Sequence, residues 1–166
     1  GGLGLNAIAI AKALEIKNIL VCDLDDSKLE AAREMGADQT LNPGQDKALA
    51  QLSALTGGGP RAVVDTVGAE GTSQLGVASL QKGGRYVIVG LFGGGLTLAL
   101  PTLPLRAISI IGSYTGNLAE LKELIDLARS GKVKPLPVTS RPMEEVGNTL
   151  DDLRDGKIVG RVVLSN

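Results

Sequence analysis

Three glycines and one aspartate carry the clearest chemical signal in this sequence. Gly1, Gly2 and Gly4 open a helical pattern, as in the second half of a G-x-G-x-x-G loop. In that loop, backbone amides at a helix N-terminus bind a pyrophosphate. Asp23 follows Gly4 by 19 residues, about the spacing at which an acidic residue holds ribose hydroxyls. The glycines alone also fit a flexible terminus, but with Asp23 they predict a nucleotide site that prefers NAD to NADP.

Small residues also follow three further predicted strands, at 65–68, 89–91 and 112–114. Ligands of doubly wound folds bind outside the carboxyl edge of the sheet, where such residues let the main chain approach a flat ring. Ordinary turns use the same residues. Asp65 has no histidine or second acid near it in sequence, so we expect a structural role at the strand end rather than acid–base catalysis.

Composition excludes most other chemistry. The chain has no histidine and one cysteine, Cys22, so its own residues form no His/Cys zinc site and no Ser-His-Asp triad. We therefore assign no catalytic and no metal-binding residue, and expect Cys22 in the core. Net charge is −1 with three aromatic residues, which argues against nucleic-acid binding. No apolar run reaches the roughly 18 residues of a membrane span, and a lone cysteine fits the cytoplasm.

The elements that must position these residues alternate between helix and strand. Helices are expected over residues 3–14, 26–35, 46–55 and 72–80, and strands over 18–22, 39–41, 62–66 and 85–89. Such alternation predicts βαβ units, and hence an α/β fold with a Rossmann-type, doubly wound parallel sheet.

The second half of the sequence is less regular. Two more strands are expected at 96–100 and 107–112, with Pro101 and Pro104 excluding a helix between them. A helix follows from Asn117 and closes at Gly131. The tail then carries a short extended piece, a helix over 142–153 and a strand over 160–164. This change of pattern predicts a nucleotide-binding domain over 1–131 and a distinct C-terminal segment over 132–166.

Six stretches together carry a family resemblance: residues 1–5 (GGLGL), 21–29 (VCDLDDSKL), 35–38 (MGAD), 64–68 (VDTVG), 83–90 (GGRYVIVG) and 156–163 (GKIVGRVV). The sequence resembles the zinc-containing alcohol dehydrogenases of the medium-chain dehydrogenase/reductase superfamily. The resemblance covers essentially the whole chain. It implies NAD-dependent hydride transfer to or from a small alcohol or carbonyl compound.

The resemblance also implies roles for individual residues. Gly1, Gly2, Leu3 and Gly4 match the pyrophosphate loop, and Asp23 matches the ribose carboxylate. The remaining cofactor contacts implied by the resemblance are Lys28 at the adenosine ribose, Thr66, Val67, Val89 and Ser113 near the adenosine or nicotinamide, and Arg161 at the pyrophosphate. Lys28 alternatively fits a solvated first-turn lysine, and Arg161 a surface charge on the last strand.

Two parts of the family pattern are missing from this sequence. The catalytic zinc ligands, the proton relay and the structural-zinc cysteines of the family belong to a preceding domain, so zinc is not expected on this chain, which alone is expected to be inactive. The first loop glycine and the strand before it are also missing. In the strand order 3-2-1-4-5-6, that strand is central. We therefore interpret the sequence as the C-terminal, cofactor-binding portion of a longer enzyme.

Two other functions also fit this sequence. A zinc-free quinone or enoyl reductase of the superfamily is one alternative, although Asp23 disfavours its usual NADPH. A non-enzymatic NAD-sensing module is the other.

Apolar residues concentrate between Leu96 and Gly112 at the expected sheet edge. An exposed apolar edge strand pairs readily with another chain. We therefore expect a homodimer or homotetramer formed through the segment from Ala107 to Gly112.

Overall fold

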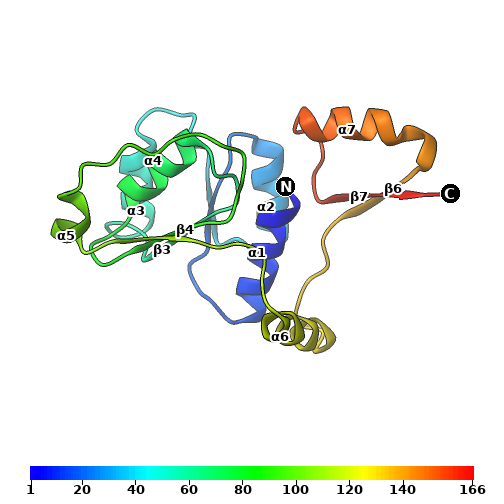
Figure 1. The fold of residues 1–166 in the computed structure, drawn as a ribbon, viewed down its shortest axis with the longest axis horizontal. Helices are drawn as coiled ribbons and strands as arrows, with labels where there is room; N and C mark the ends of the chain where they lie inside the picture. Colours follow the sequence, from blue (N-terminus) through cyan, green and yellow to red (C-terminus); the bar gives the residue numbers. More distant parts are fainter. The chain divides into compact units, whose positions relative to one another are not determined.

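The computed structural model describes all residues from 1 to 166. The chain divides into two compact units, which are described separately below (Figure 1). Unit 1 comprises residues 1–42 and 118–166, and unit 2 comprises residues 43–117. Every strand pair in both units is parallel, as the βαβ pattern predicts. No helix is both long and apolar enough to cross a lipid bilayer.

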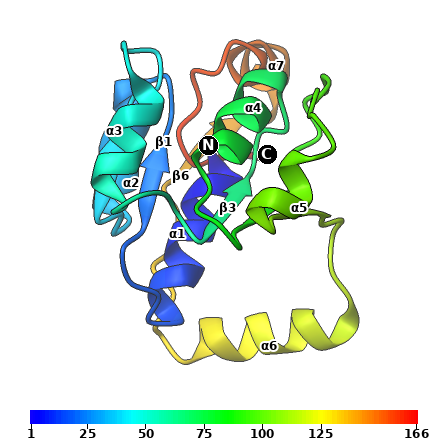
Figure 2. The same ribbon diagram turned by 90° about the vertical axis from the view of Figure 1, so that its left-hand side faces the viewer.

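Unit 1 begins with two helix–strand pairs. Its first elements are α1 (Gly2–Ala13), β1 (Leu20–Cys22), α2 (Asp26–Glu34) and β2 (Gln39–Leu41), with β1 and β2 paired. The helices α1 and α2 pack against each other (Figure 2) through a buried cluster formed by Leu5, Ile8, Ala9, Ala32 and Met35. The apolar spacing of both helices therefore places one face of each in the same core.

Local interactions fix both ends of α2. The carboxylate of Asp25 accepts the Ser27 N–H at 2.9 Å and so caps the helix. Gly36 then adopts a left-handed conformation, with φ at +106°, just after the helix ends. The strand β1 consequently runs directly into a capped helix, and Asp23 occupies the connection between them.

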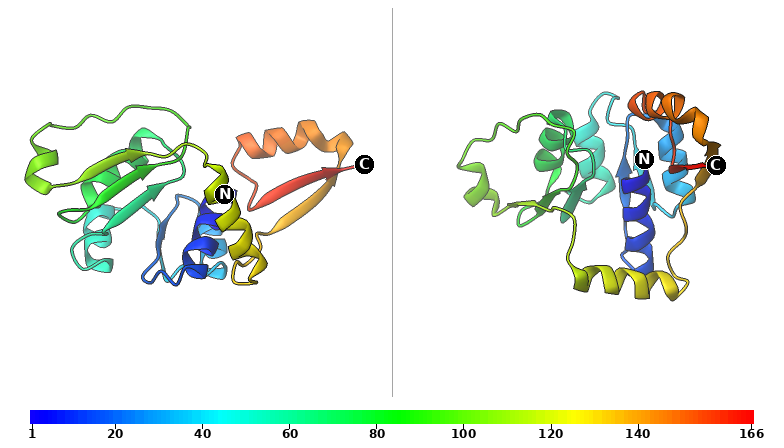
Figure 3. Two further views of the ribbon diagram at one scale, coloured as in Figure 1. Left: turned by 60° about the horizontal axis from the view of Figure 1, so that its bottom comes forward. Right: turned by 45° about the vertical axis from the view of Figure 1, so that its right-hand side comes forward.

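The remainder of unit 1 follows residue 117. It contains α6 (Leu118–Arg129), β6 (Val138–Pro142), the short 3-10 helix η1 (Met143–Glu145), α7 (Val146–Arg154) and β7 (Arg161–Ser165). β6 and β7 form a separate two-stranded sheet (Figure 3). The helix predicted to close at Gly131 is confirmed as α6, and Gly131 has φ at +75°. The expected domain boundary at residue 131 stays a prediction.

Unit 2 contains a three-stranded sheet covered by helices. Its elements are α3 (Ala48–Leu55), β3 (Ala62–Asp65), α4 (Glu70–Ser79), β4 (Arg85–Ile88), α5 (Thr102–Arg106) and β5 (Ser109–Gly112). The strand order is β3-β4-β5 (Figure 3), which makes β5 an edge strand. The core is formed by Val77, Leu80, Tyr86 and Ile108. β1 and β3 belong to separate sheets.

Three local predictions are wrong. Residues 96–100 form no strand; instead Leu96 and Leu98 pack on the core of unit 2. The prolines do not exclude a helix, because Pro101 caps α5 and Pro104 lies in its first turn, where a missing N–H breaks no helical hydrogen bond. Cys22 is exposed rather than buried, because nothing in the structure covers the sheet face onto which it projects at the end of β1.

Candidate functional site

The N-terminus of α1 presents free backbone amides. Leu5 is the first residue whose N–H bonds within the helix, to Gly1 O at 3.1 Å. The amides of Gly2, Leu3 and Gly4 precede this bond, and no side chain caps them. Unpaired amides and the helix dipole together favour a bound anion. The start of α1 can therefore hold a phosphate group.

Arg161, at the start of β7, lies directly over this helix end. A Cβ built on Gly2 would stand 1.6 Å from Nη1 and 2.1 Å from Cζ of Arg161. Only glycine at position 2 leaves room for the guanidinium in this place. The arrangement joins residues 159 positions apart and adds a cation to an anion-binding helix end. Both features fit the pyrophosphate of a dinucleotide.

Asp23 stands at the carboxyl end of β1 with one oxygen free. Its Oδ1 accepts the Asp25 N–H at 3.1 Å, and its Oδ2 accepts no hydrogen bond from the chain. The residue is only partly buried, so a ligand hydroxyl can reach the free oxygen. A carboxylate in this state can accept hydrogen bonds from a ribose diol.

Lys28 and Arg161 bring positive charge to the same place. Lys28 lies in the first turn of α2 with a side chain 20% exposed, and its Nζ is 3.9 Å from Asp25 Oδ2. Asp23, Lys28 and Arg161 all lie near enough to the backbone nitrogen of Gly1 for their charges to act on it. All three side chains are therefore close to the start of α1. The structure brings together every site residue that the sequence predicts in unit 1.

The four site residues predicted in unit 2 lie at one edge of its sheet: Thr66, Val67, Val89 and Ser113. Thr66 and Val67 follow β3, Val89 follows β4 and Ser113 follows β5. Backbone bonds join the strand ends, because Val89 N–H donates to Asp65 O at 2.9 Å and Ser113 N–H to Ile88 O at 2.9 Å. The carboxyl ends of three parallel strands are thus held in register.

The connections after β3 and β4 approach each other closely. A Cβ on Gly90 would stand 2.1 Å from the carbonyl carbon of Val67, and one on Gly68 would stand 2.1 Å from Gly90 O. Gly68 also has φ at +73°. These glycines therefore allow two main-chain segments to meet at the sheet edge, as the sequence suggests for a surface that faces a flat ring.

Asp65 has the structural role expected at the end of β3. It accepts hydrogen bonds from donors that the sequence does not indicate. Its Oδ1 accepts the N–H groups of Val67 at 2.8 Å and Gly68 at 2.9 Å. Its Oδ2 accepts the hydroxyls of Thr72 at 2.7 Å and Tyr86 at 2.5 Å. Burial alone would raise the pKa of this carboxyl, but these hydrogen bonds outweigh burial and hold it below its usual value.

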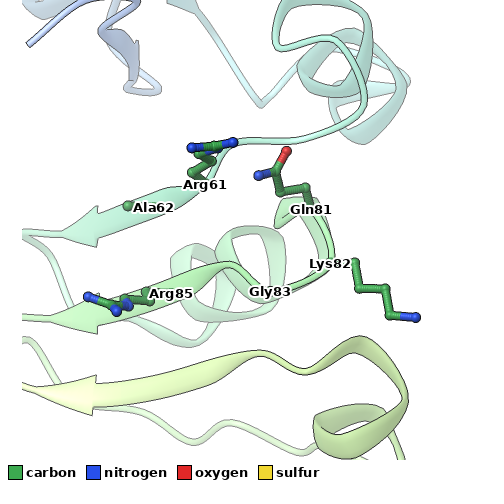
Figure 4. Close-up of a pocket in the computed structure, with 6 residues that line it drawn as sticks. All are labelled: Arg61, Ala62, Gln81, Lys82, Gly83 and Arg85. Atoms are coloured by element: carbon green, nitrogen blue, oxygen red, sulfur yellow. The ribbon is translucent and has the colours of Figure 1, made fainter.

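The largest described hollow of unit 2 does not form a competing anion site. This hollow of about 500 Å³ opens at the opposite edge of the unit 2 sheet (Figure 4). It is lined by Arg61, Ala62, Gln81, Lys82, Gly83 and Arg85. Lys82 and Arg85 extend in different directions there, so the cations do not converge on one anion. No three His, Cys, Asp or Glu side chains are grouped to hold a metal ion.

Comparisons with known proteins agree with this geometry. Residues 2–130 match the family model described as zinc-binding dehydrogenase. The NAD-dependent alcohol dehydrogenase of Sulfurisphaera tokodaii is 38% identical over 99% of this chain and 48% of its own length. An alcohol dehydrogenase of Geobacillus stearothermophilus is 37% identical over 99% of this chain and 48% of its own length.

A solved structure shows the same fold. The alcohol dehydrogenase of the archaeon Aeropyrum pernix superimposes with a TM-score of 0.92 at 33% identity, covering 100% of this chain and 48% of that one. The Rossmann-type α/β fold predicted from the sequence is thereby confirmed. This chain spans about half the length of the curated relatives that it matches. By its sequence and its fold, it belongs to the zinc-binding dehydrogenase family.

Proposed function

We propose that this chain is the cofactor-binding portion of an NAD-dependent alcohol dehydrogenase, an enzyme that transfers hydride between a small alcohol or carbonyl compound and NAD. The observation that carries the proposal is the start of α1, where Arg161 occupies the space that a side chain at position 2 would fill. Free amides, a guanidinium and the Asp23 carboxylate are the three groups that recognise a dinucleotide.

Each predicted residue has a defined task in this proposal. The amides of Gly2, Leu3 and Gly4, with Arg161, bind the pyrophosphate, while Gly1 precedes them without a side chain. Asp23 accepts hydrogen bonds from the adenosine ribose, and Lys28 adds charge beside it. The free carboxylate of Asp23 would repel a 2′-phosphate, which favours NAD over NADP. We propose that Thr66, Val67, Val89 and Ser113 contact the adenosine or nicotinamide.

The chemistry itself requires groups that this chain does not supply. When bound, NAD would supply the hydride acceptor, and a zinc ion, which no cluster of side chains in this chain is placed to hold, would polarise the alcohol oxygen. This chain holds and orients the cofactor. We also propose that the enzyme acts in the cytoplasm.

Substitution of Gly2 tests the proposal. In the full-length protein, Gly2→Ala should displace Arg161 from the start of α1 and raise the Kd for NAD about tenfold, a loss of about 1.4 kcal/mol. Isothermal titration calorimetry measures the Kd. Gly147→Ala is the matched control, because a Cβ on this α7 glycine meets nothing within 4 Å. Unchanged NAD affinity in Gly2→Ala, or no NAD binding by the unaltered protein, would refute the proposal.

We further propose that two copies of the protein associate through β5. This strand is the edge of the unit 2 sheet, and Ile110 and Ile111 are 36% and 42% exposed on it. Ile108 is 8% exposed and packs with Leu103 in the core, so it is unsuitable for a test. An Ile110→Lys, Ile111→Lys double variant should sediment as a smaller species. Leu105→Lys, which alters an exposed residue outside the strand, should not.

A further inference from the structure

The buried pair Tyr86 and Asp65 has a role that the proposed function leaves unassigned. Tyr86 is the largest fully buried side chain, with 0% exposure. Its hydroxyl donates to Asp65 Oδ2 and lies 3.0 Å from Ser73 Oγ. Because a phenol has one proton, Ser73 donates to Tyr86 while Tyr86 donates to Asp65. Desolvation and the Asp65 carboxylate raise the pKa of Tyr86 to about 12, so the phenol keeps the proton it donates.

The helix above the pair is shaped for the tyrosine ring. A Cβ on Gly76, in the middle of α4, would stand 2.6 Å from Cε2 and 3.1 Å from Cδ2 of Tyr86. Glycine inside a helix is about 1 kcal/mol less favourable than alanine. The close approach of the ring explains why a glycine is present here, and it fixes Tyr86 against α4 as well as β4.

The other oxygen of Asp65 acts on the segment that follows β3. Two consecutive N–H groups, those of Val67 and Gly68, donate to Oδ1. These donors set the turn that exposes Val67, which is 45% accessible, and that places Gly68 against Gly90. A carboxylate that rotated or moved would release both amides at once. The orientation of residues 66–68 therefore depends on what holds Oδ2.

The same aspartate also joins the neighbouring strand through its backbone. Its carbonyl oxygen accepts the N–H groups of Val89 at 2.9 Å and Gly90 at 3.0 Å. Tyr86 lies in β4, the strand that these residues follow. The ends of β3 and β4 are consequently connected in two ways: the backbone of Asp65 bonds to Val89 and Gly90, and its side chain bonds to Tyr86.

We propose that Tyr86 and Asp65 are positioning residues for NAD: their buried hydrogen bond fixes residues 66–68 in the conformation that contacts the cofactor. The inference rests on the proposed function, because it assumes that Thr66 and Val67 touch NAD. Neither buried side chain contacts the cofactor itself. Loss of their hydrogen bond should weaken cofactor binding more than it slows turnover.

The test is Tyr86→Phe in the full-length enzyme, assayed at a temperature at which circular dichroism shows it folded. We expect the Kd and KM for NAD to rise about tenfold and kcat to fall less than twofold. Ser73→Ala is the matched control, because it removes the bond on the other side of the phenol and leaves Asp65 in contact with Tyr86. A merely structural network would lower the stability of both variants and alter NAD binding in neither.

A second pair of variants tests the same oxygen of Asp65. Thr72→Val removes its other hydroxyl donor, whereas Thr72→Ser keeps one. We expect Thr72→Val to raise the Kd for NAD and Thr72→Ser to restore it. If the unaltered enzyme binds NAD and both Tyr86→Phe and Thr72→Val bind it equally well, this inference is wrong and the proposed function stands. If the unaltered enzyme binds no NAD, the proposed function fails.

Discussion

Asp23 and Asp65 hold corresponding positions in the two units, and their surroundings differ. Asp23 directly follows β1, and Asp65 is the last residue of β3. Each accepts the N–H of the residue two positions further on, at 3.1 Å and 2.8 Å. Asp23 has this one donor and is partly exposed, whereas Asp65 has four donors and is 5% exposed.

We propose that the difference separates a carboxylate that binds a ligand from one that supports the fold. A carboxylate offers about four acceptor positions. Those of Asp65 are filled by the protein, so it organises the turn around it and cannot bind a ligand. Asp23 keeps one oxygen for a hydroxyl from outside. The number of protein donors, rather than position at a strand end, distinguishes the two roles.

The largest expected effect concerns stability. Asp65→Ala should lower the free energy of unfolding by about 3 kcal/mol, because it leaves the buried Tyr86 hydroxyl and two amides without an acceptor. Asp23→Ala should lower it by less than about 1 kcal/mol. Urea unfolding monitored by circular dichroism measures both. If both variants lose a similar amount of unfolding free energy, the difference in burial and donor number between Asp65 and Asp23 does not determine their contributions to stability.

The preference for NAD over NADP should depend on Asp23, although Asp23 contributes less than Asp65 to stability. Asp23→Ser removes the carboxylate that repels a 2′-phosphate, and should narrow the ratio of kcat/KM between NAD and NADP by about 1 to 3 kcal/mol, or roughly 5- to 150-fold. Steady-state kinetics with both cofactors measure this ratio. Asp26→Ser, which alters a neighbouring exposed carboxylate, serves as the control. A ratio that Asp23→Ser leaves unchanged would contradict the assignment.

The smallest expected effect is the pH dependence that Asp65 gives to stability. Its folded-state pKa lies below its ordinary value, so its ionised form stabilises the fold. That contribution is fully present above the unfolded pKa of about 3.9 and is lost as pH falls through the folded pKa. The stability difference between the unaltered protein and Asp65→Asn should therefore shrink in acid. Urea unfolding of both proteins at pH 7 and at a series of lower pH values measures this difference. If the difference in unfolding free energy stays constant as the pH falls, the prediction is wrong.

Tertiary packing also gives two apolar segments a structure that differs from the one their sequences predict. Residues 96–100 have the apolar content of a strand, yet Leu96 and Leu98 pack on the core without pairing with another strand. Cys22 ends an apolar run typical of a buried strand but is exposed. Composition alone does not say which apolar segment finds a partner.

The sequence by itself determined what depends on near neighbours along the chain. The end of α6 at the left-handed Gly131 and the alternation of helices and strands both follow from interactions within a few residues. The spacing from Gly4 to Asp23 is equally readable, because one βα unit fixes it. These features located the candidate site and its cofactor class.

Only the tertiary structure decided which distant groups meet. Arg161 reaches the start of α1 because β7 begins beside it, and Tyr86 reaches Asp65 across 21 residues because β3 and β4 pair in parallel. No local pattern encodes these contacts, since each depends on the register of a sheet or the packing of a helix. Those contacts fix how many protein donors reach each strand-end aspartate, and so whether its carboxylate keeps an oxygen free for a ligand.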